Sequence, residues 1–170
     1  MPVLWLAAYR AWLLISFVIG LFLLYQATMH RDRPGAKPLF VLVTGALLYV
    51  SVKLTVSIVR GTPTVFVVTR FNPLGAGLAT VGFFLLVIEY TGIENPVSKR
   101  TSTGIVLVPA IVSALAVIDL EYLWVPVGPD SSTLSGYAWE FTSVALANQL
   151  YVNLLLLVGI GLLLRRGIQS

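Results

Sequence analysis

Five long apolar stretches fill most of this chain of 170 residues, and they decide what it can fold into. A helix needs about 20 mostly apolar residues to cross a hydrocarbon layer of about 30 Å. Each stretch is near or above that length, and the mean hydropathy of the chain is +0.92. The sequence therefore predicts an all-α, polytopic transmembrane helix bundle that forms a single domain over residues 1–170. The predicted spans are Leu4–Met29, Pro38–Val59, Thr64–Tyr90, Gly104–Leu120 and Ala138–Leu164.

The third stretch is interrupted by polar residues and a proline, namely Arg70, Asn72 and Pro73. Either a helix begins at Pro73, or a longer helix kinks there because proline frees a carbonyl group one turn earlier. We favour the long kinked helix over 64–90.

Positive charge is distributed unevenly between the loops. Cytoplasmic loops of membrane proteins carry an excess of Lys and Arg. Seven basic residues follow the first, third and fifth predicted helices: Arg31, Arg33, Lys37, Lys99, Arg100, Arg165 and Arg166. The longest loop, Glu121–Tyr137, has no basic residue and follows the fourth helix. We therefore predict a multi-pass protein of the cell membrane with its N-terminus outside and its C-terminus in the cytoplasm.

Composition argues against several classes of function. The net charge is +4, but no Lys/Arg run exceeds two residues and no basic–aromatic interleaving is present, so nucleic acid is not an expected partner. The chain has no cysteine, and its one histidine, His30, cannot hold a metal alone. No paired acid and base lie at matching depth in the spans. We therefore expect no cofactor, no metal and no enzymatic activity.

Several segments carry a family pattern. Arg70 is followed by a Leu-Gly pair, an apolar run and Tyr-Thr-Gly, ending at Gly92. Segment 108–128 begins at a proline-containing turn and reaches the polar sequence IDLEYLW. Segment 136–166 opens with Gly-Tyr and closes with two arginines, and a basic RPGA turn follows the first helix. Over essentially its whole length the chain resembles the N-terminal seven-helix sensor region of prokaryotic membrane histidine kinases.

The resemblance implies a sensory bundle, but the sequence departs from the family pattern in two ways. The family has seven spans followed by a cytoplasmic kinase, whereas this sequence stops after the fifth predicted span and shows no ATP-binding boxes. The family's usual histidine near the end of the fourth helix is absent, and Glu121 or Tyr122 falls close to that position. The resemblance thus implies a truncated sensor that lacks its own catalytic output.

Ionisable residues inside spans are candidate functional groups because their burial in lipid is costly. Lys53 lies in the outer half of the second predicted helix and Arg70 near the outer end of the third. Asp119 and Glu140 lie at the outer ends of the fourth and fifth. We predict that these four line an outward-facing pocket for a ligand or ion, with Arg70 the strongest candidate because the resemblance also points to it. Alternatively, the two cations reach the interface and the two acids only end their helices.

The fifth predicted helix carries amide side chains in its middle. Gln149 and Asn153 are four residues apart and share a face, with Asn148 beside them. They can line a ligand cavity or a signalling interface, or they can simply form hydrogen bonds between helices.

These observations predict a membrane-embedded signal-reception domain in contact with the lipid bilayer. Its expected partners are a second copy of the chain or a separate kinase or other output protein. The alternative is a small transporter or channel subunit that acts as an oligomer, with a pathway built from Lys53, Arg70 and the amides of the fifth helix. A sensor requires an output domain in the same polypeptide or operon, whereas a transporter requires substrate flux.

Overall fold

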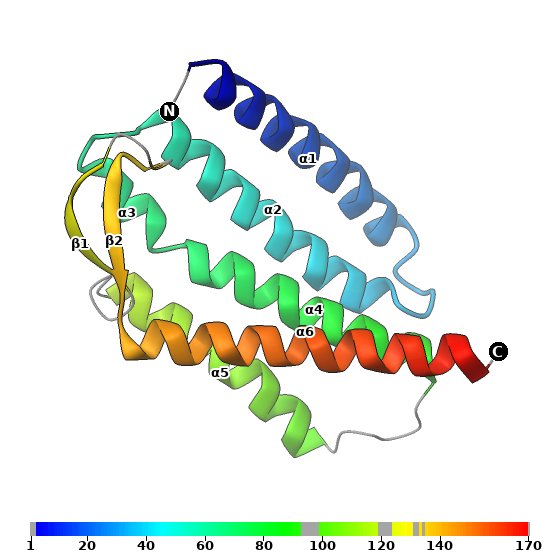
Figure 1. The fold of residues 1–170 in the computed structure, drawn as a ribbon. Helices are drawn as coiled ribbons and strands as arrows, with labels where there is room; N and C mark the ends of the chain where they lie inside the picture. Colours follow the sequence, from blue (N-terminus) through cyan, green and yellow to red (C-terminus); the bar gives the residue numbers. More distant parts are fainter. Residues whose placement is uncertain (1–2, 93–98, 119–123, 131–132, 134, 170) are drawn as a thin grey trace.

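The computed structural model describes residues 3–92, 99–118, 124–130, 133 and 135–169. Five long helices run along one direction, and a short helix and a two-stranded sheet lie at one end of the bundle (Figure 1). In chain order the elements are α1 (Val3–Met29), α2 (Ala36–Ile58), α3 (Thr64–Thr69), α4 (Asn72–Thr91), α5 (Lys99–Ile118), β1 (Trp124–Pro129), β2 (Tyr137–Phe141) and α6 (Ser143–Gln169). The predicted all-α bundle is confirmed.

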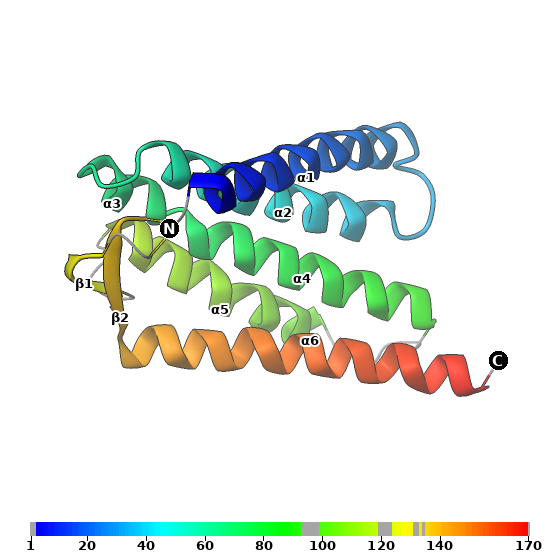
Figure 2. The ribbon, with the colours of Figure 1, turned by 45° about the horizontal axis from the view of Figure 1, so that its top comes forward.

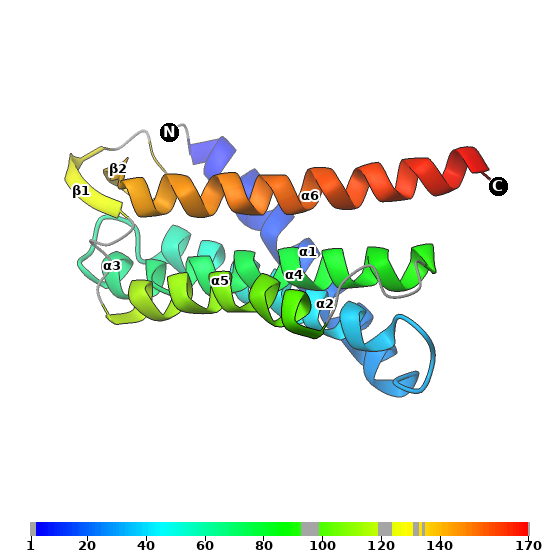
Figure 3. The ribbon, with the colours of Figure 1, turned by 90° about the horizontal axis from the view of Figure 1, so that it is seen from below.

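The centre of the bundle is α4, which packs against α2, α5 and α6, while α1 packs on the far side of α2. Figure 2 shows α1 and α6 at opposite sides with α2 and α4 between them. Figure 3 shows the two ends of the bundle. One end, which we call the hairpin end, holds α3 and the hairpin formed by β1 and β2. The other, the C-terminal end, holds the α1–α2 loop and the last turn of α6. The α1–α2 loop and the last turn of α6, which belong to the segments predicted to carry cytoplasmic charge, therefore lie at the same end.

Four segments are long and apolar enough to cross a membrane by length and composition: Leu4–Met29, Ala36–Ile58, Thr64–Thr91 and Ser143–Gly167. The fourth predicted helix is α5, which begins at Lys99 rather than Gly104 and whose apolar part, Leu107–Ile118, is shorter. The membrane class is thus supported by these helices, and the count of five spans remains a prediction.

A seam of glycines brings α2 and α4 into backbone contact. A Cβ atom added at Gly82 would lie 2.2 Å from the backbone nitrogen of Leu42, and one added at Gly45 would lie 2.2 Å from that of Ala79. At Gly75 it would lie 2.6 Å from the nitrogen of Tyr49. Small residues allow such close approach of membrane helices. We call Gly45, Gly75 and Gly82 the glycine seam.

The proline-containing interruption separates α3 from α4. The backbone stays in the right-handed helical region at Arg70 (φ −56°, ψ −29°), but the N–H of Phe71 bonds to the carbonyl of Val68, 3.2 Å away and only three residues earlier. Pro73 in the first turn of α4 has no N–H to offer the preceding turn. The long kinked helix predicted over 64–90 is therefore divided into α3 and α4, with the main helix beginning at Asn72, although Thr64–Thr91 as a whole is one candidate span.

The region before α6 differs from its prediction. The loop 121–137 contains β1, and Tyr137–Phe141 forms β2 rather than the start of a helix. The strands pair antiparallel, from Trp124 opposite Phe141 to Pro129 opposite Tyr137. The side chain of Thr142 then accepts the N–H of Ala145 at 3.3 Å, and this cap begins α6 at Ser143. An apolar strand followed directly by an apolar helix reads as one span when hydropathy alone is considered.

Helix α1 is fastened to α2 near the hairpin end. The guanidinium of Arg10 donates to the carbonyl of Ser57 and, through Nε, to its Oγ atom 3.3 Å away. Ser57 is fully buried. These hydrogen bonds provide acceptors for the guanidinium group of an arginine that lies within an otherwise apolar helix.

Candidate functional site: a cavity beneath the hairpin

A cavity of about 320 Å³ lies at the hairpin end, between the sheet and the helices. It draws its lining from α2, α3, α4, the hairpin and α6. The lining residues are Val52, Lys53, Val56, Thr69, Asn72, Ser135, Trp139, Phe141 and Gln149. We call this space the hairpin cavity. It combines apolar walls with one cation and several neutral polar groups.

The hairpin is held firmly over the cavity. The indole N–H of Trp139 donates to Oγ of Ser135 at 2.9 Å, and the N–H of Gly61 donates to the carbonyl of Ser135 at 3.0 Å. The hydroxyl of Tyr137 donates to the carbonyl of Gly61 at 3.2 Å. The rings of Tyr137 and Trp139 also pack on Phe66, with centroids 4.9 and 5.4 Å away. The two bonds with Gly61 tie the hairpin to the α2–α3 connection, the ring contacts pack it on α3, and the bond between Trp139 and Ser135 lies within the hairpin.

Below the hairpin lies a buried apolar cluster of Val52, Val56 and Val65. Partly buried side chains pack against it, including Tyr137 and Trp139 of β2. Alternate residues of a strand face the same side, so Tyr137, Trp139 and Phe141 share the face directed at the bundle. This alternation is the sequence signal that could have identified the hairpin residues of the site, which sequence reasoning missed.

Lys53 lies where the sequence predicted a functional cation, in α2 and on the cavity wall. Its ammonium group lies 5.2 Å from the ring centroid of Tyr49, within the range of a cation–π interaction. Within the described part of the chain, no carboxylate forms an ion pair with Lys53. Among the described residues, the positive charge of Lys53 thus meets an aromatic face and no carboxylate.

Arg70 lies at the α3–α4 break, beside the cavity rather than in its lining. Its Nη1 atom donates to the carbonyl of Val117 at 3.3 Å, in the last turn of α5. A cation is favourable there because the carbonyl groups at a helix C-terminus carry partial negative charge. The Nε atom of Arg70 and Oδ1 of the neighbouring Asn72 are buried without a hydrogen-bond partner among the described residues.

The amides of α6 divide between the cavity and the helix itself. Gln149 lines the cavity and donates from Nε2 to Oδ1 of Asn153 at 3.2 Å, one turn further along α6. This bond lies within one helix rather than between two helices. Oδ1 of Asn148 is buried without a partner in the described structure. Of these amides, Gln149 is the one that reaches the cavity.

Of the two predicted acids, Glu140 does not join this group. Glu140 is exposed on β2 and does not line the cavity, whereas its neighbours Trp139, which is partly buried, and Phe141, which is exposed, do line it. Asp119 lies outside the described residues. The structure therefore brings together Lys53 and Gln149 from the predicted set, places Arg70 next to them, and adds Asn72, Ser135 and the two aromatic residues of β2.

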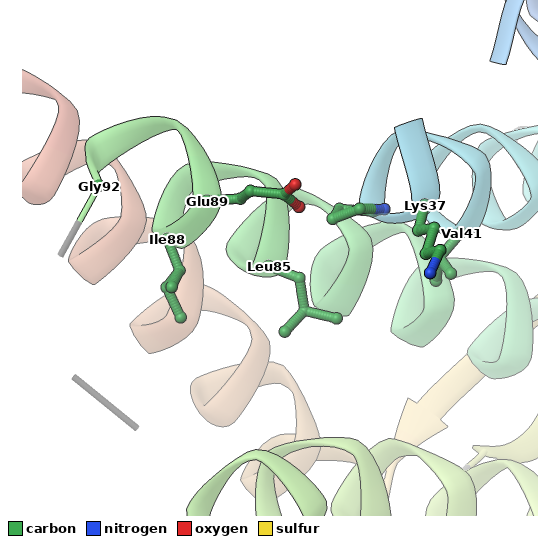
Figure 4. A pocket seen from close by; sticks show the side chains of 7 residues that line it. Lys37, Val41, Leu85, Ile88, Glu89 and Gly92 are labelled. Atoms are coloured by element: carbon green, nitrogen blue, oxygen red, sulfur yellow. The ribbon is translucent and has the colours of Figure 1, made fainter. Parts of the chain in front are cut away.

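A second, more open hollow of about 620 Å³ lies at the C-terminal end, between the start of α2 and the end of α4 (Figure 4). In Figure 4 the side chain of Glu89 extends from α4 toward the start of α2. Its Oε1 atom accepts the N–H of Gly35 at 2.6 Å. Gly35 has φ of +82°, a conformation that favours glycine, and it precedes the first turn of α2. This contact fastens the α1–α2 turn to the end of α4.

Comparison with protein families matches residues 12–170 to the N-terminal 7TM region of histidine kinase. This match covers nearly the whole chain. The chain belongs to this family. The resemblance drawn from the sequence is confirmed, and with it the assignment to a membrane-embedded sensor region involved in signal transduction. The comparisons with curated proteins and with solved structures give no match.

Proposed function

We propose that this chain is the signal-reception part of a histidine-kinase system, itself non-catalytic, and that it senses at the hairpin end. The observation that carries the proposal is the family match over residues 12–170. The output is a kinase module, either in the same polypeptide or in a separate protein. The hairpin cavity supplies a place where a signal can alter packing, because four helices and the sheet contribute to its lining.

Charge supports an orientation in which the hairpin end faces outward across a cell membrane. The C-terminal end carries Arg31, Arg33 and Lys37 in the α1–α2 turn region and Arg165 and Arg166 in α6. The hairpin carries acidic residues and no basic ones. An excess of Lys and Arg marks the cytoplasmic side. In this orientation the cavity lies in the outer half and α6 ends inside.

Helix α6 is the element best suited to carry the signal. Its 27 residues span about 40 Å at 1.5 Å per residue. Gln149 lines the cavity near one end, and the guanidinium carbon of Arg166 lies 5.5 Å from the ring centroid of Tyr90 at the other. A signal shifts a two-state bundle only through contacts that differ between the states. A change in contacts at Gln149 that tilts or rotates α6 would alter the Arg166 contact.

Exposed apolar side chains on α1 and α6 support contact with the lipid bilayer and allow association with a second copy. Large exposed side chains on these helices include Trp12, Phe22, Leu150 and Leu157. We therefore propose a homo-oligomer or a complex with the kinase as the working form. Such faces are unfavourable in water but are covered by lipid or by another helix.

The test uses membranes that contain this chain together with its kinase. Gly159 of α6 packs on Phe83 of α4, since an added Cβ would lie 2.8 Å from the ring, whereas Gly161 faces open space. Gly159→Leu should change kinase autophosphorylation by several-fold, and the matched Gly161→Leu should leave it unchanged. Identical autophosphorylation in both variants and in membranes lacking the chain would contradict a sensory role. Solute flux through liposomes would instead support the transporter alternative.

A further inference from the structure

We propose that the hairpin cavity binds a small amphiphilic carboxylate, whose charged group faces Lys53 and whose apolar part lies against Val56, Trp139 and Phe141. The proposal deepens the sensory function above and rests on it for the consequence of binding. The observation behind it is the charge of Lys53. The half-buried ammonium group of this residue lies on the cavity wall and has no acidic partner within the described residues.

The charge of the ligand follows from Lys53. A lysine inside an apolar helix is costly unless it reaches water or meets an anion. Here its one described ring or charge contact is Tyr49, at 5.2 Å. A carboxylate delivered by a ligand would supply the missing negative charge in a site partly shielded from water, where such a pair is stronger than at an exposed surface.

The kind of anion follows from the number of positively charged donors. Phosphate sites use several donors, typically an arginine fork or a helix N-terminus with free N–H groups. The hairpin cavity offers one ammonium group, and the nearby guanidinium of Arg70 is directed to the carbonyl of Val117. A single cation matches a single negative charge. A carboxylate therefore fits this donor set better than a phosphate group does.

The apolar part of the ligand follows from the remaining walls. Val52, Val56, Trp139 and Phe141 present hydrocarbon and aromatic surface, and the volume of about 320 Å³ lies at the small end of the range for ligand pockets, about 300–1,000 Å³. Asn72 adds a second polar point, because its Oδ1 atom is buried without a hydrogen-bond partner. The cavity thus suits a short amphiphile rather than a long lipid.

Trp139 provides a direct readout of binding, because it lines the same cavity as Lys53. The full chain is placed in nanodiscs of zwitterionic phosphatidylcholine and titrated with 8-bromooctanoate, whose terminal bromine quenches nearby indole rings. We expect saturable quenching that is removed by Trp139→Phe. Octanoate should displace the probe, and the neutral octanol should not.

Lys53→Met should weaken the apparent affinity at least tenfold, whereas Lys53→Arg should retain binding. The matched control is Lys37→Met at the opposite end of the bundle, which should bind like the unchanged protein. Circular dichroism establishes that each variant is folded. If Lys53→Met binds as tightly as the unchanged protein, or if quenching rises without saturation as the fatty acid partitions into lipid, the proposal is overturned.

Kinase output separates this proposal from the proposed function. Saturable, Lys53-dependent binding that changes autophosphorylation supports both. Saturable binding without any change in autophosphorylation supports the ligand site but counts against sensing through this cavity. Absence of saturable binding together with an intact Gly159→Leu effect overturns the ligand site and leaves the sensory function standing.

Discussion

Helices α2 and α6 both pack on α4, but they do so in contrasting ways. Along α2 the contact is backbone to backbone, and a Cβ added at Gly82 would lie 2.2 Å from a main-chain nitrogen. Along α6 the closest glycine contact is with a side chain, the ring of Phe83. In the most apolar part of 64–91, which contains α4, 44% of the residues are buried. In the most apolar part of 143–167, which belongs to α6, 11% are buried. The α2–α4 pair is therefore a fixed frame, and α6 is an element that can be repositioned against it.

The largest expected effect comes from breaking the frame. Gly82→Leu forces a side chain into the backbone of Leu42, which cannot move without separating the two helices. We expect the free energy of unfolding to fall by about 3 kcal/mol or more, at the upper end of overpacking costs. Thermal unfolding followed by circular dichroism in detergent measures this. Gly161→Leu on α6, with open space around it, should change stability by less than about 0.5 kcal/mol.

The bond between Trp139 and Ser135 lies within the hairpin and is expected to hold the Trp139 ring in place over the frame, and Ser135→Ala tests this. The variant removes the acceptor of the Trp139 indole N–H and leaves a partly buried donor unpaired. We expect a loss of about 2 kcal/mol in unfolding free energy and a red shift of the Trp139 fluorescence. Ser143→Ala, an exposed position at the start of α6, is the control. An unchanged emission spectrum in Ser135→Ala would mean that the hairpin is not held by this bond.

Repositioning α6 should cost less than breaking the frame. Gly159→Leu meets the edge of the Phe83 ring, and a ring can turn or α6 can shift outward. We expect a destabilisation of about 1 kcal/mol, well below that of Gly82→Leu. Comparison of the two unfolding curves under the same conditions measures the difference. Equal losses in the two variants would remove the distinction between frame and moving element.

The smallest effect is expected at the C-terminal end of the frame. Glu89→Gln weakens the charge-assisted bond to the N–H of Gly35 and the favourable placement of a carboxylate near the start of α2. We expect a loss of about 0.5 kcal/mol because the group is exposed. Faster trypsin cleavage after Arg31, the basic residue of this turn that is not followed by proline, measures the release of the turn. Glu140→Gln at the hairpin end should leave the cleavage rate unchanged.

Much of the frame could be predicted from the sequence. Apolar runs of spanning length located the long helices. The close contact of α2 with α4 through the glycine seam could not be deduced, because spacing along one helix does not identify the helix that it meets. The basic residues of the α1–α2 turn and of the end of α6 were predicted on one side, and in the structure these two segments lie at the same end of the bundle.

The candidate site was less accessible to sequence reasoning. The cost of charge in lipid drew attention to Lys53, and helical spacing drew attention to Gln149. Tyr137–Phe141 forms a strand but was predicted as the start of a helix, because its aromatic residues make it nearly as apolar as the helix that follows. The direction of Arg70 toward Val117 depends on where α5 ends in space, which no local pattern encodes.

The contact between Arg10 and Ser57 has a consequence for how the protein enters the membrane. The two residues lie 47 positions apart, on successive helices. When α1 leaves the ribosome its guanidinium has no partner. An arginine at the centre of a spanning helix costs about 2.5–3.5 kcal/mol on insertion scales, and Arg10, in the first third of α1, carries part of that cost. We therefore expect α1 to wait beside the translocon until α2 is made and to enter lipid together with it. Glycosylation mapping of truncated nascent chains would reveal this delay, and Arg10→Leu should abolish it.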